Sequence, residues 1–199
     1  MPRLTRRFVV IAVLVAALIG TAAVAAAAAS RHFGYKKIRE GVPTGVKHFK
    51  LHSTDLRAGQ PIPQQFWGCN GPGVSPELSW SGAPAGTRSF VVTIFDADAP
   101  TGSGFWHWVA WDLPAGTHEL PTGAVLPAGA VNGTNDGGGL GYTGPCPPAG
   151  DITHHYHFSV VALDVPSLGL PASSRGAVLG FNAGQHAIGE ATFTATARQ

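Results

Sequence analysis

Short runs of β-branched and aromatic residues, separated by loops rich in glycine and proline, recur along most of this chain. Ser89–Phe95 is a continuous apolar run typical of a central strand, and Phe105–Leu113 and His155–Leu163 have the same character. Val46–Leu51 and Gly189–Ala197 alternate apolar with polar residues, as half-buried strands do. With 27 Gly, 16 Pro and only 12% charged residues, the composition argues against a coiled coil or a helical bundle. We therefore predict a mostly β domain.

Apolar residues at broadly helical spacing predict one helix, over Ser173–Ile188, although three glycines inside it weaken a helix. The segment Leu126–Asp151 is a long loop rich in glycine and proline. Loops of this length in a small domain usually build a binding site. Runs of strands with one late helix predict a β-sandwich-like or α+β domain with few helices.

The first 29 residues have the layout of a secretory signal. An uncharged apolar run, residues 8–29, follows the basic segment Arg3–Arg7 and ends in Ala27–Ala29, which suits a signal-peptidase site. An uncleaved membrane anchor is the alternative, because about 20 apolar residues can span a bilayer. We predict an exported protein (secreted, periplasmic or in the cell envelope), with residues 30–45 as a linker and residues 46–199 as the folded domain.

The charge of the domain argues against a nucleic-acid partner. The formal net charge of the chain is +2, but Arg3, Arg6 and Arg7 all precede the apolar run. The remainder carries 10 Lys and Arg against 11 Asp and Glu. A nearly neutral domain offers no broad attraction for a phosphate backbone.

Two cysteines, Cys69 and Cys146, lie in loops rich in glycine and proline. In an exported chain they are a candidate disulfide. Their separation in sequence says nothing about their distance in space, and buried free cysteines are common, so the sequence leaves the pairing open. Neither cysteine has a second Cys or a His at the spacing of a zinc finger, so no metal site is predicted there.

Two groups of polar residues stand next to predicted strands. Asp96 and Asp98 are two positions apart and would share one side of an extended segment, although two solvated turn aspartates would look the same. His107 lies between Trp106 and Trp108, and strand alternation places it on the face opposite both rings. A structural histidine is the alternative to a functional one at this position.

Three histidines, His154, His155 and His157, lie at the start of the predicted strand His155–Leu163. Alternation places His154 and Tyr156 on one face and His155 and His157 on the other, so no face gathers three metal ligands. The sequence contains no G-x-S-x-G, H-E-x-x-H, P-loop or dinucleotide motif. A metal site would need a further ligand from His107 or an aspartate, and we predict no metal and no cofactor.

Several motifs occur in an order that resembles the phosphatidylethanolamine-binding protein family, in particular its bacterial, Raf-kinase-inhibitor-like branch. The main motifs are Asp96-Ala-Asp-Ala-Pro100, Trp106-His-Trp108, Gly144-Pro-Cys-Pro-Pro148 with Gly150, and His154-His-Tyr156. Supporting motifs are Cys69-Asn-Gly, Val74-Ser-Pro-Glu-Leu-Ser-Trp80, and Gly133-Thr-Asn-Asp136 before Gly141-Tyr142. The resemblance runs from about Phe49 to Thr194, which is almost the whole predicted domain.

The resemblance implies a Greek-key-like sandwich of two antiparallel β-sheets with few short helices and a small anion-binding pocket at one end. The positions that match the pocket motif are Asp96, Asp98, His107, Gly144, Pro145, His154 and Tyr156. The chain departs from the family in having Ala97 where proline is usual. It also ends soon after the last strand, without the helical extension of eukaryotic members.

We therefore expect a non-catalytic binding protein for a phosphate-bearing or other anionic group, such as a phospholipid headgroup, with regulation of a kinase or other signalling partner as a further role. Imidazole and tyrosine groups would donate to phosphate oxygens, while the aspartates would orient a histidine and favour its cationic form. One alternative is a hydrolase that uses Asp96, His107 and His154 as acid and base. Another is a protease or kinase inhibitor that acts through surface loops. The family also implies a homodimer, for which the sequence shows no exposed apolar stripe.

Overall fold

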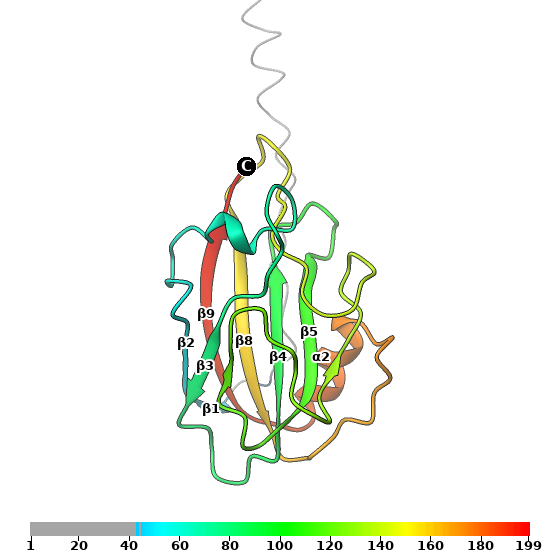
Figure 1. The fold of residues 1–199 in the computed structure, drawn as a ribbon. Helices are drawn as coiled ribbons and strands as arrows, with labels where there is room; N and C mark the ends of the chain where they lie inside the picture. Colours follow the sequence, from blue (N-terminus) through cyan, green and yellow to red (C-terminus); the bar gives the residue numbers. More distant parts are fainter. Residues whose placement is uncertain (1–42, 44) are drawn as a thin grey trace, which may run out of the picture. The chain divides into compact units, whose positions relative to one another are not determined.

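Two β-sheets make up most of the regular structure in residues 43 and 45–199, the part of the chain that the computed structural model describes (Figure 1). The larger sheet has the strand order β1-β9-β8-β4-β5-β7, and the smaller sheet has the order β2-β3-β6. The strands of the larger sheet are β1 (Lys47–His48), β4 (Ser89–Asp96), β5 (Phe105–Pro114), β7 (Val131–Asn132), β8 (His154–Leu163) and β9 (Ala187–Ala197). Those of the smaller sheet are β2 (Lys50–His52), β3 (Leu78–Ser81) and β6 (Glu119–Leu120).

The mostly β prediction is confirmed, and the predicted central strands are found within one residue of their expected ends. The predicted strand Val46–Leu51 is divided, because β1 joins the larger sheet and β2 the smaller one. Phe49 lies between them and donates its backbone N–H to Glu190 O at 3.1 Å. β1 runs parallel to β9, whereas the other strand pairs in the described residues are antiparallel.

The main core lies between the two sheets. β4 is apolar on both faces: Phe90, Val92 and Ile94 pack into the main core, whereas Val91 packs into a second apolar cluster on the outer face. The helix α2 (Gly176–Gly184) covers that second cluster through Leu179. A strand that is buried on both faces accounts for the continuous apolar run in the sequence.

The helix is shorter than the predicted Ser173–Ile188. It begins at Gly176, because Arg175 before it is extended, and the ring of Trp106 lies 2.2 Å from an ideal Cβ on Gly176, so only glycine fits there. It ends before β9 starts at Ala187. Another short helix, the 3-10 helix η1 (Gln64–Phe66), lies in the loop after β2.

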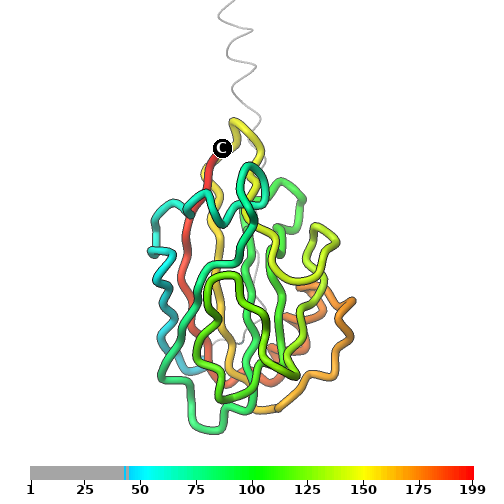
Figure 2. Tube along the Cα trace, viewed as in Figure 1, coloured from blue at the N-terminus to red at the C-terminus, as the bar shows by residue number. Residues whose placement is uncertain are grey.

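The C-terminus ends beside the loop that precedes β8 (Figure 2). There Gly150 donates its backbone N–H to Gln199 O at 3.2 Å. The predicted signal segment, residues 1–29, and most of the predicted linker lie outside the described residues. Of the helices in the described part, none is long and apolar enough to span a membrane.

Two substitutions in α2 test its packing. Gly176→Ala is expected to lower the free energy of unfolding by about 1–3 kcal/mol, because the added Cβ would overlap the Trp106 ring. Gly180→Ala meets nothing within 4 Å and is expected to raise it by up to about 1 kcal/mol, because alanine favours a helix. Urea denaturation measures both effects, and equal changes in the two variants would contradict the contact with Trp106.

Candidate functional site

The carboxylate of Asp96 lies at the end of β4 and is almost completely buried, with 2% of the residue exposed. Its Oδ1 accepts a hydrogen bond from the Asp98 amide at 2.9 Å. Its Oδ2 lies 2.7 Å from Nδ1 of His154, which is 1% exposed and begins the neighbouring strand β8. A buried carboxylate requires such partners, because without them the loss of hydration would be very costly.

His154 lies between two carboxylates. Its Nδ1 faces Asp96, and its Nε2 lies 3.4 Å from Oδ2 of Asp151, three residues earlier in the chain. A carboxylate can only accept a hydrogen bond, so each ring nitrogen satisfies its neighbour only when it carries a proton. Both ring nitrogens of His154 are therefore directed at carboxylate oxygens. Asp151, whose side chain is 26% exposed, connects this buried pair with solvent.

A β-bulge in β5 directs His107 toward the same cluster. Ile94 is opposite Trp108 and Phe95 is opposite Trp106, so His107 is an extra residue in the pairing of β4 with β5. Trp106 packs into the outer cluster and Trp108 into the main core. The prediction that His107 lies opposite both tryptophans is therefore wrong, because the bulge interrupts the alternation on which it depended.

The hydrogen bonds of His107 fix its tautomer. Its Nδ1 lies 2.9 Å from Thr143 O, and a carbonyl only accepts, so Nδ1 carries a proton. Its Nε2 then points toward Oδ2 of Asp96 at 3.9 Å, longer than a hydrogen bond. This nitrogen is the group of His107 that remains for another partner.

Tyr156 completes the cluster from the same face of β8 as His154, which confirms the predicted alternation of these two residues. Its ring meets that of His107 edge-on, with the centroids 5.2 Å apart. Its hydroxyl is buried and has no hydrogen-bond partner in the described part of the chain. Burial raises the pKa of this hydroxyl, and the negative charge of Asp96 raises it further.

The electrostatic balance of the cluster keeps Asp96 ionised. Burial alone would raise the pKa of Asp96, but His107, His154 and the Asp98 amide outweigh it and hold this pKa below its ordinary value. The pKa of Asp151 is also lowered, chiefly by the hydrogen bond from the Ile152 amide.

Asp98 lies at a different place from Asp96, although the two share a motif. Its Oδ2 accepts hydrogen bonds from the backbone N–H of His155 at 2.8 Å and from Nδ1 of the same residue at 2.7 Å. His155 is exposed, so the Asp98 carboxylate faces the outside of β8. Asp98 contacts the buried cluster through its backbone N–H, which donates to Asp96.

Gly144 and Pro145 form a close crossing of two chain segments. A Cβ on Gly144 would lie 2.2 Å from Phe66 O and 2.3 Å from Gly68 N, so the backbones touch where only glycine fits. Gly68 donates its N–H to Pro145 O at 2.9 Å. The described contacts of these two predicted site residues are therefore with residues 66–69.

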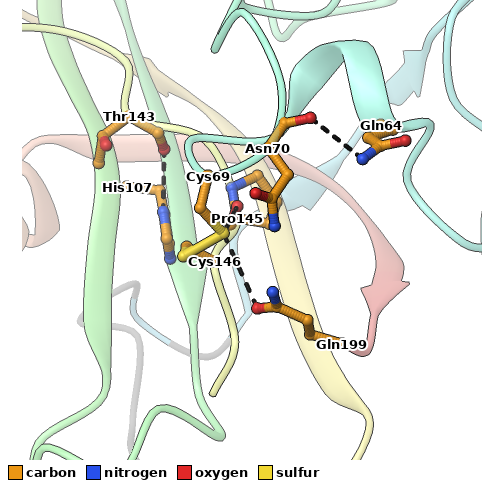
Figure 3. The surroundings of a disulfide bond; sticks show 8 residues. All are labelled: Gln64, Cys69, Asn70, His107, Thr143, Pro145, Cys146 and Gln199. Carbon is orange, nitrogen blue, oxygen red and sulfur yellow. Dashed lines mark hydrogen bonds between the residues drawn. A yellow bond between two sulfur atoms is a disulfide. The ribbon is translucent and has the colours of Figure 1, made fainter. Parts of the chain in front are cut away.

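The disulfide between Cys69 and Cys146, which the sequence left open, joins the same two segments (Figure 3). The two Cα atoms are 5.4 Å apart. Thr143, whose carbonyl holds His107, lies three residues before Cys146. The disulfide thus fixes the loop that orients His107.

Sequence reasoning did not select Asp151 or Thr143. A signal for Asp151 was present, since an aspartate three residues before His154 can reach its ring, but the contact of Thr143 depends on the fold. In the described residues, no group of three or more His, Cys, Asp or Glu side chains is arranged to hold a metal ion.

Comparisons with known proteins point to a single protein family. The family model described as phosphatidylethanolamine-binding protein matches residues 52–198. The chain is 42% identical to Escherichia coli YbcL over 156 residues (73% of this chain, 85% of YbcL) and 44% identical to Escherichia coli YbhB over 155 residues (73% and 98%).

The solved structure of Escherichia coli YbcL, titled as a new member of the mammalian PEBP family, superposes with a TM-score of 0.73 at 40% identity. The match covers 76% of this chain and 98% of that one. A Mycobacterium tuberculosis relative named "Putative lipoprotein LppC" is 40% identical over 138 residues, which is 69% of this chain and 66% of that protein.

The depressed pKa of Asp96 predicts how stability depends on pH. The stabilisation that ionised Asp96 gives the folded state is complete above the ordinary pKa of 3.8. It is lost as the pH falls through the lower pKa of the folded state. Below pH 3.8, Asp96→Asn is expected to reduce the slope of unfolding free energy against pH by up to about 1.4 kcal/mol per pH unit, the value for one proton. Urea titrations between pH 2 and 7 measure this slope. An unchanged slope in the variant would contradict the assigned direction.

Proposed function

Because the chain belongs to the phosphatidylethanolamine-binding protein family, we propose that it binds a phosphate-bearing group at the cluster formed by Asp96, His107, His154 and Tyr156. The group would be a phosphate ester of the kind found in phospholipid headgroups. Binding without turnover is the activity proposed. Asp151, the most exposed carboxylate of the cluster, would lie at the entrance.

The unpartnered hydroxyl of Tyr156 is the observation that supports this proposal most directly. A buried hydroxyl without a hydrogen bond costs about 1–3 kcal/mol, so it is uncommon unless a missing partner completes it. A phosphate oxygen is a strong acceptor. Nε2 of His107, which has no hydrogen bond at 3.9 Å from Asp96, would supply a second donor when it is protonated.

Asp96 has a positioning role in this proposal, because a carboxylate repels an anion. It fixes the ring of His154 through the 2.7 Å contact and lies 3.9 Å from Nε2 of His107. Both rings are then held in position before the ligand arrives. Such preorganisation reduces the reorganisation needed when an anion binds.

The hydrogen bonds of the two histidines favour binding over hydrolysis. A general base needs a free ring nitrogen near a hydroxyl or a water that it can activate. Both nitrogens of His154 face carboxylates, and Nδ1 of His107 is held by Thr143 O, so only Nε2 of His107 is left to act as a base. Among the described residues, no serine, threonine or cysteine side chain is hydrogen-bonded to either ring.

We extend the proposal to export, on the basis of the apolar leader and of the name of the mycobacterial relative. A disulfide in the domain is compatible with an oxidising compartment. A protein partner and a homodimer remain expectations that the family implies. In this proposal any regulatory effect on a partner would depend on occupation of the phosphate site.

Removal of the Tyr156 hydroxyl is expected to change ligand affinity and stability in opposite directions. Tyr156→Phe is expected to raise the unfolding free energy by about 1 kcal/mol, because it removes a buried polar group that has no partner. The same change is expected to weaken phosphoethanolamine binding about tenfold, which corresponds to one lost hydrogen bond of about 1.4 kcal/mol. Calorimetric titration of the full chain in a neutral detergent, with urea denaturation alongside, measures both.

Tyr142→Phe is the matched control. The Tyr142 hydroxyl donates to Phe66 O at 2.6 Å, so its removal is expected to lower the unfolding free energy by about 1 kcal/mol and to leave phosphoethanolamine affinity unchanged. The proposal fails if the wild-type chain shows no saturable binding, or if both variants weaken binding equally.

A further inference from the structure

Two polar groups in the cluster around Asp96 have no hydrogen-bond partner among the described residues. They are the buried hydroxyl of Tyr156 and Nε2 of His107, which lies 3.9 Å from Asp96. The other ring nitrogens are engaged, because His154 faces carboxylates on both sides and Nδ1 of His107 is held by Thr143 O. The cluster therefore offers a ligand two hydrogen-bonding groups.

The number of these groups matches a phosphate diester. A diester has two oxygens that carry no ester bond, and each can accept from one of the two groups when His107 carries a proton on Nε2. A phosphate monoester has a third such oxygen. Because Oδ2 of Asp96 lies 3.9 Å from Nε2 of His107, this additional oxygen would lie near a carboxylate, which cannot donate to it.

The charges of the cluster limit the negative charge that it can accept. The pKa values of Asp96 and Asp151 both lie below the ordinary value, so both carboxylates are ionised at neutral pH. Even if His107 and His154 were both protonated, their two charges would only balance those of the carboxylates. A site of this kind has no excess of positive charge with which to attract a doubly charged anion.

Lysine and arginine do not supply the missing positive charge. In the described part of the chain, neither type of residue forms an ion pair with the two carboxylates of the cluster. Arg198 follows Ala197, which is opposite His154 in the pairing of β8 with β9, but it lines a separate cavity with Gln64 and Trp67. Protein sites for doubly charged phosphate groups usually contain arginine or lysine. The composition of this cluster therefore favours a ligand with less charge.

Asp151 is the more exposed of the two carboxylates. Its side chain is 26% exposed, against 3% for that of Asp96. Its Oδ2 lies 3.4 Å from Nε2 of His154 and its Oδ1 accepts from the Ile152 amide at 2.8 Å, so the carboxylate is held toward the cluster. A negative charge at this position repels an anion in proportion to the charge that the anion carries.

We propose that Asp151 makes the site selective for phosphate diesters, which carry one negative charge, over phosphate monoesters, which carry nearly two at pH 8. This inference rests on the proposed function, because it concerns the same site. Asp151 acts through repulsion, while Tyr156 and His107 pair with the two free oxygens of the diester. Asp151 is thus a specificity-determining residue and does not itself bind the phosphate.

Two ligands that differ by one methyl group test the proposal. Phosphoethanolamine is a monoester, and 2-aminoethyl methyl phosphate is the matching diester. In calorimetric titrations of the full chain in a neutral detergent at pH 8, the diester is expected to bind about tenfold more tightly. Asp151→Asn keeps the shape of the side chain and an oxygen for the Ile152 amide but removes the charge. It is expected to raise the affinity about threefold for the diester and about tenfold for the monoester, because the repulsion doubles with the charge of the ligand.

Two further variants separate charge from structure. Asp151→Glu retains the charge and is expected to keep the wild-type preference. Asp164→Asn is the matched control, since Asp164 also pairs with a histidine, His186 at 3.1 Å, but follows the last residue of β8, at the end opposite His154. The inference is overturned if the wild-type chain binds both ligands equally, or if Asp151→Asn lowers the affinities or changes both by the same factor. Binding of neither ligand by the wild-type chain would instead contradict the proposed function, and the inference with it.

Discussion

The buried charge of Asp96 is the constraint around which this end of the molecule is organised. A carboxylate that is 2% exposed must have hydrogen-bond donors or positive charge beside it, and three parts of the chain supply them. The turn after β4 contributes the amide of Asp98, and β8 contributes His154. The bulge in β5 brings His107 to the same carboxylate. Imidazole rings and a backbone amide are thus gathered inside the fold, where an anion would meet few competing water molecules.

Features that depend on local periodicity were predictable from the sequence. β4, β5 and β8 are buried strands that leave continuous apolar runs, so their ends were predicted within one residue. The shared face of His154 and Tyr156 followed from alternation alone. The orientation of His107 did not, because nothing in the sequence around it marks the extra residue of a bulge. Alternation is a reliable guide only while the register is unbroken.

Features that depend on contacts between distant segments were not predictable. Cys69 and Cys146 are 77 residues apart, and the close crossing of Gly68 with Gly144 brings their loops together. The start of α2 lies against the ring of Trp106, a contact that helix propensity does not reveal. The resemblance to a family gave the pocket residues as a set. The structure assigns them different parts, with Asp96 at the centre and Asp98 turned toward the exposed His155.

The protonation state of His107 is the most direct test of the claim that the cluster around Asp96 binds a phosphate-bearing group. Selective ¹⁵N labelling of histidine in the full chain allows the ring nitrogens to be followed by NMR at pH 7 while phosphoethanolamine is added. The account predicts that Nδ1 of His107 carries a proton throughout, because Thr143 O accepts from it, and that Nε2 becomes protonated as the ligand binds. The exposed ring of His155 should not respond. Saturable binding that leaves the His107 and His154 resonances unchanged would contradict the account.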